Sequence, residues 1–536
     1  MVAEQSPASR RDFLRSVGVA GGAGVLYSAM GALGLAPVPD VRADAYRAPQ
    51  RSDFALTGRG GKKVLVLGGG IAGLATAYEL GKAGYDCRIL EAKDRPGGRN
   101  WTVRGGTTLT DLDGRTQTAS FTKGQYMNAG PARLPQSHIT LEYCRELGVE
   151  LQVFTNQNAN AYIYNGSSDA LSGKPMRWRT AKADVYGYVS ELLAKATDQG
   201  ALDARLTAQD KEGLIAFLQS FGAITGKADG YAYTGTDRRG YSVEPGAAFQ
   251  KGTVLGAVPS LSDVIASGVG QRFAFEFGYD QAMLMFQPVG GMDAIPYALA
   301  KAIGQNRITY GAKALEVKDL PDGADVTYKD ASGRTRTQRA DFVVAAMPPM
   351  VMARLKHNLG AEVTAALKYP VPTPVGKIGL EYRSRWWETD EHIYGGITPT
   401  DMDLSTIWYP SYGYQGPRGT LIGYYNFGDN AVAYGDLPHA QRLARAVSRG
   451  VKIHGDKYRT ELDHSFSVAW HRTPYIEAGW TSWPSQTGPE YKLLNQPAGH
   501  VYFAGDWLSH VIAWQHGAFS SARKVVTDIH ERVMAA

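Results

Sequence analysis

Cysteine is almost absent from this chain of 536 residues, which contains only Cys87 and Cys144. Two cysteines cannot build a disulfide framework or a four-thiolate metal site, so the hydrophobic core must hold the fold together. The eleven histidines show no His-x-x-x-His spacing beside carboxylates, and the sequence therefore predicts no metal site. It also lacks the Gly-x-Ser-x-Gly elbow of a serine hydrolase.

A large excess of one charge is lacking as well. The formal net charge is +6, and no block of lysine and arginine is interleaved with aromatic residues, so we expect no nucleic-acid partner. Hydrophobic residues make up 44% and charged residues 20%, which is typical of a folded globular protein. Because a single core stops growing near roughly 250 to 300 residues, the length predicts more than one domain.

The N-terminal segment has the order of an export signal. Residues 9–15 read Ser-Arg-Arg-Asp-Phe-Leu-Arg, an apolar run follows over 17–35, and residues 43–45 form a small-residue cleavage site. This order is typical of a twin-arginine signal peptide over 1–45, and we expect the twin-arginine export machinery to carry the protein. The apolar run is rich in glycine and is followed by two prolines, so the mature protein should be secreted or periplasmic without a membrane anchor.

A strand, a glycine turn, a helix and a second strand then follow in the order of a dinucleotide-binding unit. Residues 64–67 form the apolar run of a buried parallel strand, and residues 68–73 read Gly-Gly-Gly-Ile-Ala-Gly. A helical pattern leads to a second strand over 87–90, which ends at Glu91. The complete order predicts a nucleotide site more strongly than the glycine motif alone.

Each part of this unit has a role in binding. Gly68 permits the tight turn, Gly70 lets the backbone approach a pyrophosphate, and Gly73 lets the helix pack closely on the strand. The N-terminus of the helix offers free N–H groups and the positive end of its dipole. Glu91 can accept hydrogen bonds from an unphosphorylated ribose, which favours FAD or NAD.

The segment after this second strand carries a family resemblance. Residues 91–102 read Glu-Ala-Lys-Asp-Arg-Pro-Gly-Gly-Arg-Asn-Trp-Thr and resemble the flavin monoamine oxidase superfamily, whose second strand is followed by this Gly-Gly-Arg turn. The resemblance implies FAD rather than NAD and makes Arg99 a ligand of the diphosphate, a role that suits a guanidinium fork. Some members attach FAD through a cysteine near the position of Trp480, and this chain has none there, so we expect noncovalent FAD.

A second segment distinguishes branches of the superfamily. Residues 128–135 read Asn-Ala-Gly-Pro-Ala-Arg-Leu-Pro and resemble the Gly-x-x-Arg segment of L-amino-acid oxidases, with secreted bacterial members the most similar. The resemblance implies that Gly130 turns against the flavin and that Arg133 binds the substrate carboxylate. A bidentate contact of this kind is strong and directional.

Other matches extend the resemblance along the mature chain. Residues 288–293 resemble the glycine turn that re-enters the FAD domain, and Ala314 falls where the family contacts the adenine. Lys377 matches the lysine that holds a water near flavin N5. The strand over 423–427 resembles the one whose tyrosine joins the arginine at the carboxylate, and we assign that role to Tyr425. Its neighbour Tyr424 points to the opposite face of a strand and stays an alternative.

The last match covers residues 503–518. It implies that Asp506 contacts the ribityl chain and that the terminal helix points its N-terminus at the flavin. The family's Gly-Trp opening is Ala513-Trp514 here. Trp514 and Trp480 match the two aromatic walls beside the substrate, which would favour apolar or aromatic side chains. The role of His516 stays open.

The site residues that follow from motif and resemblance fall into three groups. The catalytic residues are Lys377, Arg133 and Tyr425. The substrate-binding residues are Arg133, Tyr425, Trp480, Trp514 and Ala513. The cofactor-binding residues are Gly68, Gly70, Ile71, Ala72, Gly73, Glu91, Ala92, Arg99, Gly130, Pro131, Ala132, Arg133, Ala314, Asp506, Ala513, Trp514, Gln515 and Ala518.

The predicted fold class is α/β, with a discontinuous Rossmann-like FAD-binding domain, a mixed-sheet substrate domain and a helical insertion. Helical periodicity over 181–196 and 207–221 supports the insertion. After the signal, the predicted division is an arm over 46–60; the FAD-binding domain over 61–125, 288–350 and 497–536; the substrate domain over 126–174 and 351–496; and the helical domain over 175–287.

The resemblance implies oxidative deamination of L-amino acids, with apolar or aromatic side chains preferred. Hydride transfer from Cα to FAD, with oxygen as the final acceptor, would yield a 2-oxo acid, ammonia and hydrogen peroxide. It also implies a homodimer. One alternative is an amine oxidase whose primary or secondary amine substrate lacks a carboxylate, and another is a flavin-bearing protein that oxidises nothing.

Overall fold

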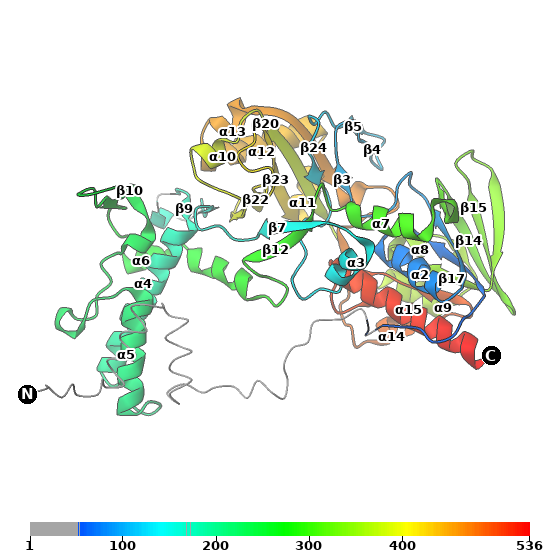
Figure 1. Ribbon diagram of the computed structural model, residues 1–536, viewed down its shortest axis with the longest axis horizontal. Helices are drawn as coiled ribbons and strands as arrows, with labels where there is room; N and C mark the ends of the chain where they lie inside the picture. The colour runs from blue at the N-terminus through cyan, green and yellow to red at the C-terminus, as the bar shows by residue number, and fades with distance from the viewer. Residues whose placement is uncertain (1–51, 53, 168, 172) are drawn as a thin grey trace, which may run out of the picture. The chain divides into compact units, whose positions relative to one another are not determined.

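The computed structural model describes residues 52, 54–167, 169–171 and 173–536 (Figure 1). The predicted signal peptide, residues 1–45, and part of the predicted arm lie outside the described residues. Two compact units are present, one covering Tyr162–Ala274 and the other the described residues up to Ala161 together with Phe275–Ala536. The predicted helical domain, 175–287, starts and ends 13 residues later than the first unit. None of the helices in the described ranges has the length and apolar character needed to span a membrane.

The larger unit is built on a five-stranded parallel sheet. Its order is β13-β2-β1-β17-β26, and every neighbouring pair is parallel. The strands are β1 (Lys63–Leu67), β2 (Asp86–Glu91), β13 (Ile308–Tyr310), β17 (Phe342–Ala345) and β26 (Val501–Phe503). The strands predicted at 64–67 and 87–90 are therefore confirmed, and segments far apart in the sequence complete the sheet.

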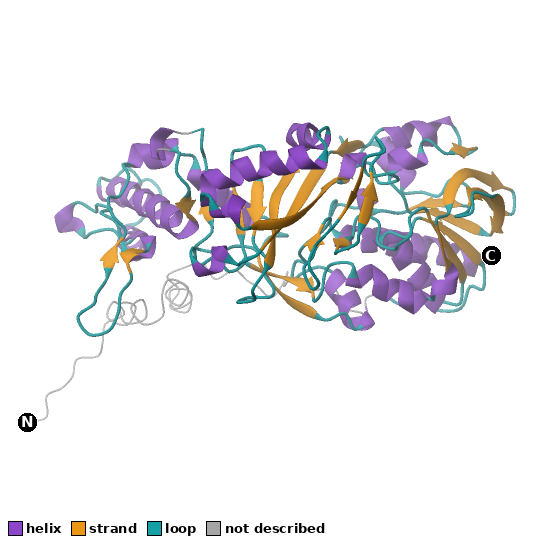
Figure 2. Ribbon diagram, turned by 90° about the horizontal axis from the view of Figure 1, so that it is seen from above, coloured by secondary structure: helices purple, strands orange, loops and turns teal. Residues whose placement is uncertain are grey.

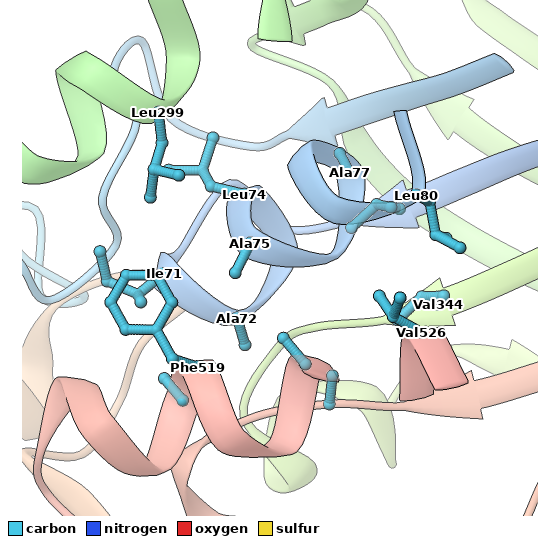
Figure 3. Close-up of a cluster of buried hydrophobic side chains, with 14 of the residues drawn as sticks. Ile71, Ala72, Leu74, Ala75, Ala77, Leu80, Leu299, Val344, Phe519 and Val526 are labelled. Carbon is cyan, nitrogen blue, oxygen red and sulfur yellow. The ribbon is translucent and has the colours of Figure 1, made fainter. Parts of the chain in front are cut away.

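Both faces of this sheet are buried because its central strands are apolar throughout. Val64 and Val66 pack under helices, whereas Leu65 and Leu67 pack on the opposite face. The helices on the first face are α2 (Ile71–Lys82), α3 (Thr140–Leu147), α7 (Ala294–Ile303) and α15 (Gln515–Ala535). Figure 3 shows Phe519 of α15 beside Ile71 of α2, with Leu299 of α7 beside Leu74. Alternating residues of one strand thus fix two layers.

A second, four-stranded sheet covers the opposite face. Its order is β16-β15-β14-β18, formed by β14 (Lys313–Leu320), β15 (Gly323–Lys329), β16 (Thr335–Ala340) and β18 (Lys356–His357). The short helices α8 (Pro349–Met352), α9 (Ala361–Lys368) and α14 (Pro489–Leu494) contribute to the same core.

An antiparallel five-stranded sheet carries the other half of the site. Its order is β21-β22-β23-β20-β24, formed by β20 (Val375–Tyr382), β21 (Ile397–Pro399), β22 (Thr406–Trp408), β23 (Gly419–Phe427) and β24 (Leu462–Ala469), which are among the orange strands of Figure 2. The associated helices are α10 (Trp386–Thr389), α11 (Gly428–Gly435), α12 (His439–His454) and α13 (Lys457–Thr460). Strand-like runs predicted at 378–382 and 421–425 are the central pair of this sheet.

Four two-stranded ribbons connect these layers. They are β3 (Thr102–Val103) with β6 (Met127–Asn128), β4 (Thr108–Thr110) with β5 (Thr116–Thr118), β7 (Leu151–Thr155) with β12 (Leu284–Pro288), and β19 (Val371–Thr373) with β25 (Trp480–Ser482). The ribbon of β7 and β12 brings the segment after Phe275 back to the chain near residue 150.

The smaller unit is mainly helical. It contains α4 (Trp178–Asp198), α5 (Ala208–Gly222), α6 (Leu261–Ala266) and the short ribbons of β8 (Tyr162–Ile163) with β9 (Met176–Arg177) and of β10 (Tyr241–Val243) with β11 (Thr253–Val254). The two predicted helices are confirmed as α4 and α5. Thr207 caps α5 in a reciprocal pair with Asp210, and a buried ion pair of 2.7 Å joins Asp184 to Arg239.

Candidate active site

A cavity of about 650 Å³ follows the carboxyl ends of β1 and β2 and continues to the antiparallel sheet. Its volume lies within the usual range of roughly 300 to 1,000 Å³ for ligand pockets. Glu91 lines one part, and Trp480 and Trp514 line another. The position is the one at which open parallel sheets bind ligands, just beyond the ends of their strands.

The glycine turn opens onto this cavity. Gly70 is the N-cap of α2, no side chain caps the helix there, and a Cβ on Gly70 would meet no atom within 4 Å. Gly73 lies beneath the turn, where a Cβ would approach the carbonyl oxygen of Gly68 to 2.0 Å. The turn therefore presents free helix N–H groups to the cavity, and only glycine at position 73 permits it.

Glu91 closes the nucleotide end. One carboxylate oxygen accepts from the N–H of Gly69 at 2.5 Å, and the other accepts from the N–H of Lys93 at 2.8 Å. Burial raises the pKa of Glu91, and these two backbone donors offset part of the rise. Each oxygen keeps a further acceptor position, which suits two neighbouring ribose hydroxyls.

Two residues predicted to contact the cofactor are paired with each other. Arg99 forms an ion pair with Asp506 and donates to the carbonyl of Gly479 at 2.7 Å. The second oxygen of Asp506 accepts from the N–H of Ala513 at 3.0 Å. Both residues line the cavity. Their roles at the diphosphate and the ribityl chain stay predictions, and the pairing shows that each also shapes the cavity wall.

Three buried polar atoms of cavity-lining residues have no partner in the described part of the chain. They are Oδ1 of Asn100, Nε2 of Gln515 and Nε1 of Trp507, and the side chains of Asn100 and Gln515 share one hydrogen bond of 2.9 Å. Gln515 begins α15, whose N-cap Trp514 forms no side-chain cap. An unpaired acceptor, an unpaired donor and an open helix N-terminus fit a ligand with polar ring edges and phosphates, as FAD has.

Ala513 has a left-handed backbone with φ of +70°. This conformation costs an L-residue roughly 1 to 2 kcal/mol, and glycine, which the family resemblance implies at this position, would adopt it without that cost. Strain of this kind concentrates at functional sites. The hydrogen bond from Ala513 to Asp506 holds the turn in place.

Lys377 lies on β20 and is only 1% exposed. Its Nζ donates to the carbonyl oxygen of Gly130 at 2.5 Å and lies 4.2 Å from the centre of the Tyr425 ring. Burial, together with repulsion from Arg133, lowers the pKa of Lys377 to about 7. Near neutral pH this amine therefore gains and loses a proton readily.

The structure separates the two candidate tyrosines. Tyr425 pairs with Lys377 across the sheet and lines the cavity, whereas Tyr424 is 1% exposed and packs on Tyr434 of α11, with ring centres 4.6 Å apart. Alternation along β23 sends their side chains to opposite faces. Burial raises the pKa of Tyr425, and the charge of Arg133 opposes this rise, so the phenol stays a hydrogen-bond donor.

Arg133 is buried beside the cavity, although it is not among the residues that line it. Its guanidinium lies 4.6 Å from the ring centre of Trp408 and 5.8 Å from that of Trp514. Nη2 donates to Oε1 of Gln281 at 3.2 Å. Nε and Nη1 have no hydrogen-bond partner among the described residues. Burial lowers the pKa of Arg133 to about 10, so it is a cation at neutral pH.

His516 lies outside the cavity lining. Its Nδ1 accepts from the N–H of Ile139 at 3.1 Å, and its ring lies 4.7 Å from that of His138. Burial and the neighbouring His138 lower the pKa of His516 to about 4. His516 therefore contributes to the structure as an acceptor for the backbone N–H of Ile139.

Most predicted site residues are brought together in one cavity. Its lining includes the predicted residues Gly68, Gly70, Ile71, Ala72, Glu91, Ala92, Arg99, Gly130, Pro131, Ala314, Lys377, Tyr425, Trp480, Asp506, Ala513, Trp514, Gln515 and Ala518. Gly73, Ala132 and Arg133 lie behind that surface. Ala132 packs in the aromatic core of the substrate half, and its predicted cofactor contact stays untested.

Several residues of the part of the cavity that borders the antiparallel sheet, here called the substrate half, could not be predicted from the sequence. Trp470 lines the cavity and donates to the carbonyl of Ala129 at 2.9 Å, and Trp408 supports Arg133. No local pattern distinguishes these tryptophans from core residues. Gln281 falls within the predicted helical domain, 175–287, and no local pattern in the sequence links it to Arg133, with which it shares a hydrogen bond. In the described ranges, no cluster of three or more potential metal ligands occurs.

Comparisons with known proteins agree with this arrangement. The model of the family described as flavin containing amine oxidoreductase matches residues 71–530. An L-amino-acid oxidase of Crotalus adamanteus is 26% identical over 487 residues, covering 88% of this chain and 87% of the relative, and the L-amino-acid oxidase BmooLAAO-I of Bothrops moojeni is 25% identical, covering 88% and 89%.

Solved structures show the same fold at lower identity. A putrescine oxidase bound to putrescine has a TM-score of 0.58 and 19% identity, covering 87% of this chain and 98% of its own. Cyclohexylamine oxidase from Brevibacterium oxydans IH-35A has a TM-score of 0.59 and 16% identity, covering 88% and 100%. The common feature is a parallel sheet for the nucleotide combined with an antiparallel sheet for the substrate.

Proposed function

The chain belongs to the family of flavin-containing amine oxidoreductases, and from this premise we propose that it is an L-amino-acid oxidase. Family membership implies FAD-dependent oxidation of an amine or an amino acid. The choice of an amino acid depends on one observation: Arg133 is a buried guanidinium beside the cavity, and two of its nitrogens have no partner among the residues that the structure describes. A buried cation of this kind is costly unless an anion completes it, and a substrate carboxylate can bind Nη2 together with Nε or Nη1 as a bidentate pair, replacing the contact of Nη2 with Gln281.

The residues of the substrate half orient the amino acid. Arg133 holds the carboxylate, and the phenol of Tyr425 donates to one of its oxygens. Trp480 and Trp514 lie on either side of the substrate and exclude water, so that the Cα hydrogen faces the flavin. Orientation of this kind supplies a large part of the rate acceleration. The aromatic walls favour apolar or aromatic side chains.

Bound FAD would supply the redox chemistry, as the acceptor of the Cα hydride with oxygen as the final oxidant and hydrogen peroxide as its product. The substrate must arrive as a neutral amine. The imino acid that it becomes takes up water and releases ammonia and a 2-oxo acid. Lys377, with a pKa lowered to about 7, exchanges a proton near the reacting carbon through a water that it holds.

The residues that would hold FAD are those of the nucleotide half. Glu91 binds the ribose, the Gly68–Gly70 turn and Arg99 bind the diphosphate, and the N-terminus of α15 meets the flavin ring. Attachment is noncovalent in this proposal, because both cysteines are buried and lie outside the cavity lining. Release of all flavin on acid precipitation is the expected result, and flavin that remains with the precipitate would refute it.

A peroxide assay tests the substrate class. L-Phenylalanine, D-phenylalanine and 2-phenylethylamine share one aromatic ring and differ in carboxylate and stereochemistry. We expect peroxide with L-phenylalanine at a kcat/KM far above that of the other two. The alternative is an amine oxidase, and the contact of Arg133 with Gln281 favours it, because that contact gives the arginine one structural partner. Preference for 2-phenylethylamine would establish this alternative.

Export by the twin-arginine route and assembly as a homodimer are further proposals. The export proposal depends on the motif at residues 9–15, and a secreted or periplasmic location follows from it. Replacement of Arg10 and Arg11 by lysine should leave the protein in the cytoplasm on cell fractionation. The dimer depends only on the family resemblance, and a monomer mass in light scattering would exclude it.

A further inference from the structure

Two segments beside Arg133 are held together along their length. Leu134 and Phe286 exchange backbone hydrogen bonds of 2.7 and 3.0 Å, and the side chain of Gln136 donates to the carbonyl of Leu284 at 2.9 Å. The first segment carries Arg133, and the second begins β12. The residues just before β12 are thereby placed over the guanidinium.

Gln281 uses this placement to contact the arginine. Its Oε1 accepts from Nη2 of Arg133 at 3.2 Å and from Nδ2 of Asn156 at 3.3 Å. Both distances are long for N–H···O bonds, and the acceptor is neutral. Nε and Nη1 of Arg133 remain unpartnered among the described residues. A carboxylate would replace this single neutral oxygen with two charged ones, which Arg133 binds more strongly.

The neighbouring Asp280 anchors the same segment. One of its carboxylate oxygens lies 2.6 Å from Nε2 of His138, whose side chain is 3% exposed. The ring of His138 packs edge-on against Trp514, with centres 5.2 Å apart. A single contact therefore ties the segment that covers Arg133 to an aromatic wall of the cavity.

Side chains around this anchor are largely exposed. Phe277 is 79% exposed, Tyr279 is 74% exposed and Met283 is 64% exposed. A segment with so little buried apolar surface opens at low free-energy cost. Residues 278–282 can therefore leave Arg133 without unfolding the strand that follows, whereas Met283 stays in place because its carbonyl accepts from the N–H of Asn156 at 2.8 Å.

We propose that Gln281 occupies the carboxylate position on Arg133 in the ligand-free protein and yields it to the substrate. His138 and Asp280 are positioning residues that return residues 278–282 to their place over the bound ligand. The inference rests on the proposed function in one respect, since it takes the entering anion to be the substrate carboxylate. It adds a residue whose chemistry sets the affinity for that anion.

Variants of Gln281 in the FAD-loaded enzyme test whether this side chain occupies the carboxylate position on Arg133. Gln281→Glu puts a carboxylate on Arg133 within the chain itself, whereas Gln281→Met keeps the length and removes the acceptor. We expect Gln281→Glu to raise the Kd for benzoate at least ten-fold, as measured by the change in flavin absorbance. The same variant should raise KM for both substrates unequally, and the increase for L-phenylalanine should be at least ten times the increase for 2-phenylethylamine. Gln281→Met should bind benzoate more tightly than the wild type. Equal weakening by both variants would overturn the proposal.

Variants of Asp280 test the anchor. Asp280→Ala should raise KM for L-phenylalanine several-fold with a much smaller change in kcat, and Asp280→Glu should restore part of the loss. Chymotrypsin should cleave Asp280→Ala faster near Phe277 and Tyr279, and benzoate should slow that cleavage in the wild type. A variant with wild-type KM and wild-type cleavage would remove the positioning role.

The two proposals fail in different ways. If Gln281→Glu weakens benzoate binding but the enzyme oxidises no amino acid, the role of Gln281 on Arg133 is supported and the L-amino-acid oxidase activity is rejected. If the enzyme oxidises L-phenylalanine and Gln281→Glu changes neither KM nor the Kd for benzoate, the oxidase activity is supported and the role of Gln281 is rejected.

Discussion

Replacing Arg133 by methionine should separate activity from stability. Methionine has no charge and no donor, and its side chain follows the arginine chain to about the position of Nε, so it replaces the aliphatic stem and leaves the guanidinium position beside Trp408 open. A carboxylate binds the guanidinium fork through Nη2 together with Nε or Nη1, and Nε and Nη1 have no partners in the described chain. A hydrogen bond to a charged group contributes roughly 1.5 to 3 kcal/mol, and two of them contribute about 3 to 6 kcal/mol.

Part of that gain is offset when substrate binds, because Arg133 gives up its bond to Gln281, which is long at 3.2 Å and therefore contributes only about 1 kcal/mol. The net is about 2 to 5 kcal/mol. Since about 1.4 kcal/mol corresponds to a factor of ten, kcat/KM for L-phenylalanine should fall by roughly 30-fold to several thousand-fold. Peroxide formation measured over a range of substrate concentrations gives this ratio.

The same substitution should not destabilise the protein. Arg133 is buried, and no carboxylate is among its contacts in the described residues. Replacing an uncompensated buried ion with an apolar side chain of similar volume is often neutral or stabilising by about 1 to 4 kcal/mol. Thermal unfolding of the FAD-loaded variant should therefore occur at or above the wild-type temperature.

Two controls make the result specific. Arg133→Lys keeps the charge and loses the fork, so its kcat/KM should fall between those of Arg133→Met and the wild type. With 2-phenylethylamine, which has no carboxylate, the loss in Arg133→Met should be far smaller. A parallel loss for amine and amino acid, or a loss below ten-fold for L-phenylalanine, would refute the carboxylate role.

Three further substitutions probe other parts of the site. Folding lowers the pKa of Lys377 from 10.5 to about 7, so between pH 7 and pH 10 the unfolded chain binds more protons than the folded one, and the stability of the wild type rises with pH. Lys377→Met lacks this dependence, so its stability advantage over the wild type in thermal unfolding should shrink by roughly 2 to 3 kcal/mol from pH 7 to pH 9. A constant difference would contradict the pKa shift. Glu91→Gln should lower flavin affinity about ten-fold through one weakened charged hydrogen bond, measured as flavin retained per protein on gel filtration; full retention would exclude a ribose contact. Gly73→Ala places a Cβ 2.0 Å from the carbonyl of Gly68 and should cost about 1 to 3 kcal/mol in unfolding free energy, whereas Gly81→Ala on the same helix meets no atom within 4 Å and is the matched control.

The nucleotide half could be predicted because its signals are local. The strand at 64–67, the glycine turn and Glu91 lie within 30 residues, and hydrophobic periodicity with turn chemistry defines each of them. The structure places them as predicted, from β1 to the end of β2. Contacts between neighbours in sequence need no knowledge of the tertiary fold.

The substrate half could be predicted only in part, because its contacts join distant segments. Arg133 is 148 residues from Gln281 and lies against Trp408, which no pattern marks. Strand alternation separates Tyr424 from Tyr425 without saying which faces the cavity. That choice depends on Tyr434 of α11, which covers Tyr424.

The charge of the substrate half has a consequence for the reaction itself. Arg133 and Lys377 repel one another enough to lower the pKa of the lysine, and their contacts in the described residues include no carboxylate. An entering carboxylate relieves this repulsion, whereas the ammonium group of the same amino acid experiences it. In the proposed reaction the site should therefore lower the pKa of the bound ammonium and favour the neutral amine, which is the form that can give up hydride.

The two cations also predict selectivity and pH dependence. An amino acid with a cationic side chain adds a third positive charge near Arg133 and Lys377, so lysine and arginine should be poor substrates relative to methionine or leucine of comparable length. The kcat/KM for L-phenylalanine should rise from pH 6 to pH 9 as the amine loses its proton. A flat profile, or a preference for L-lysine, would mean that the two cations are compensated by a group absent from their present contacts.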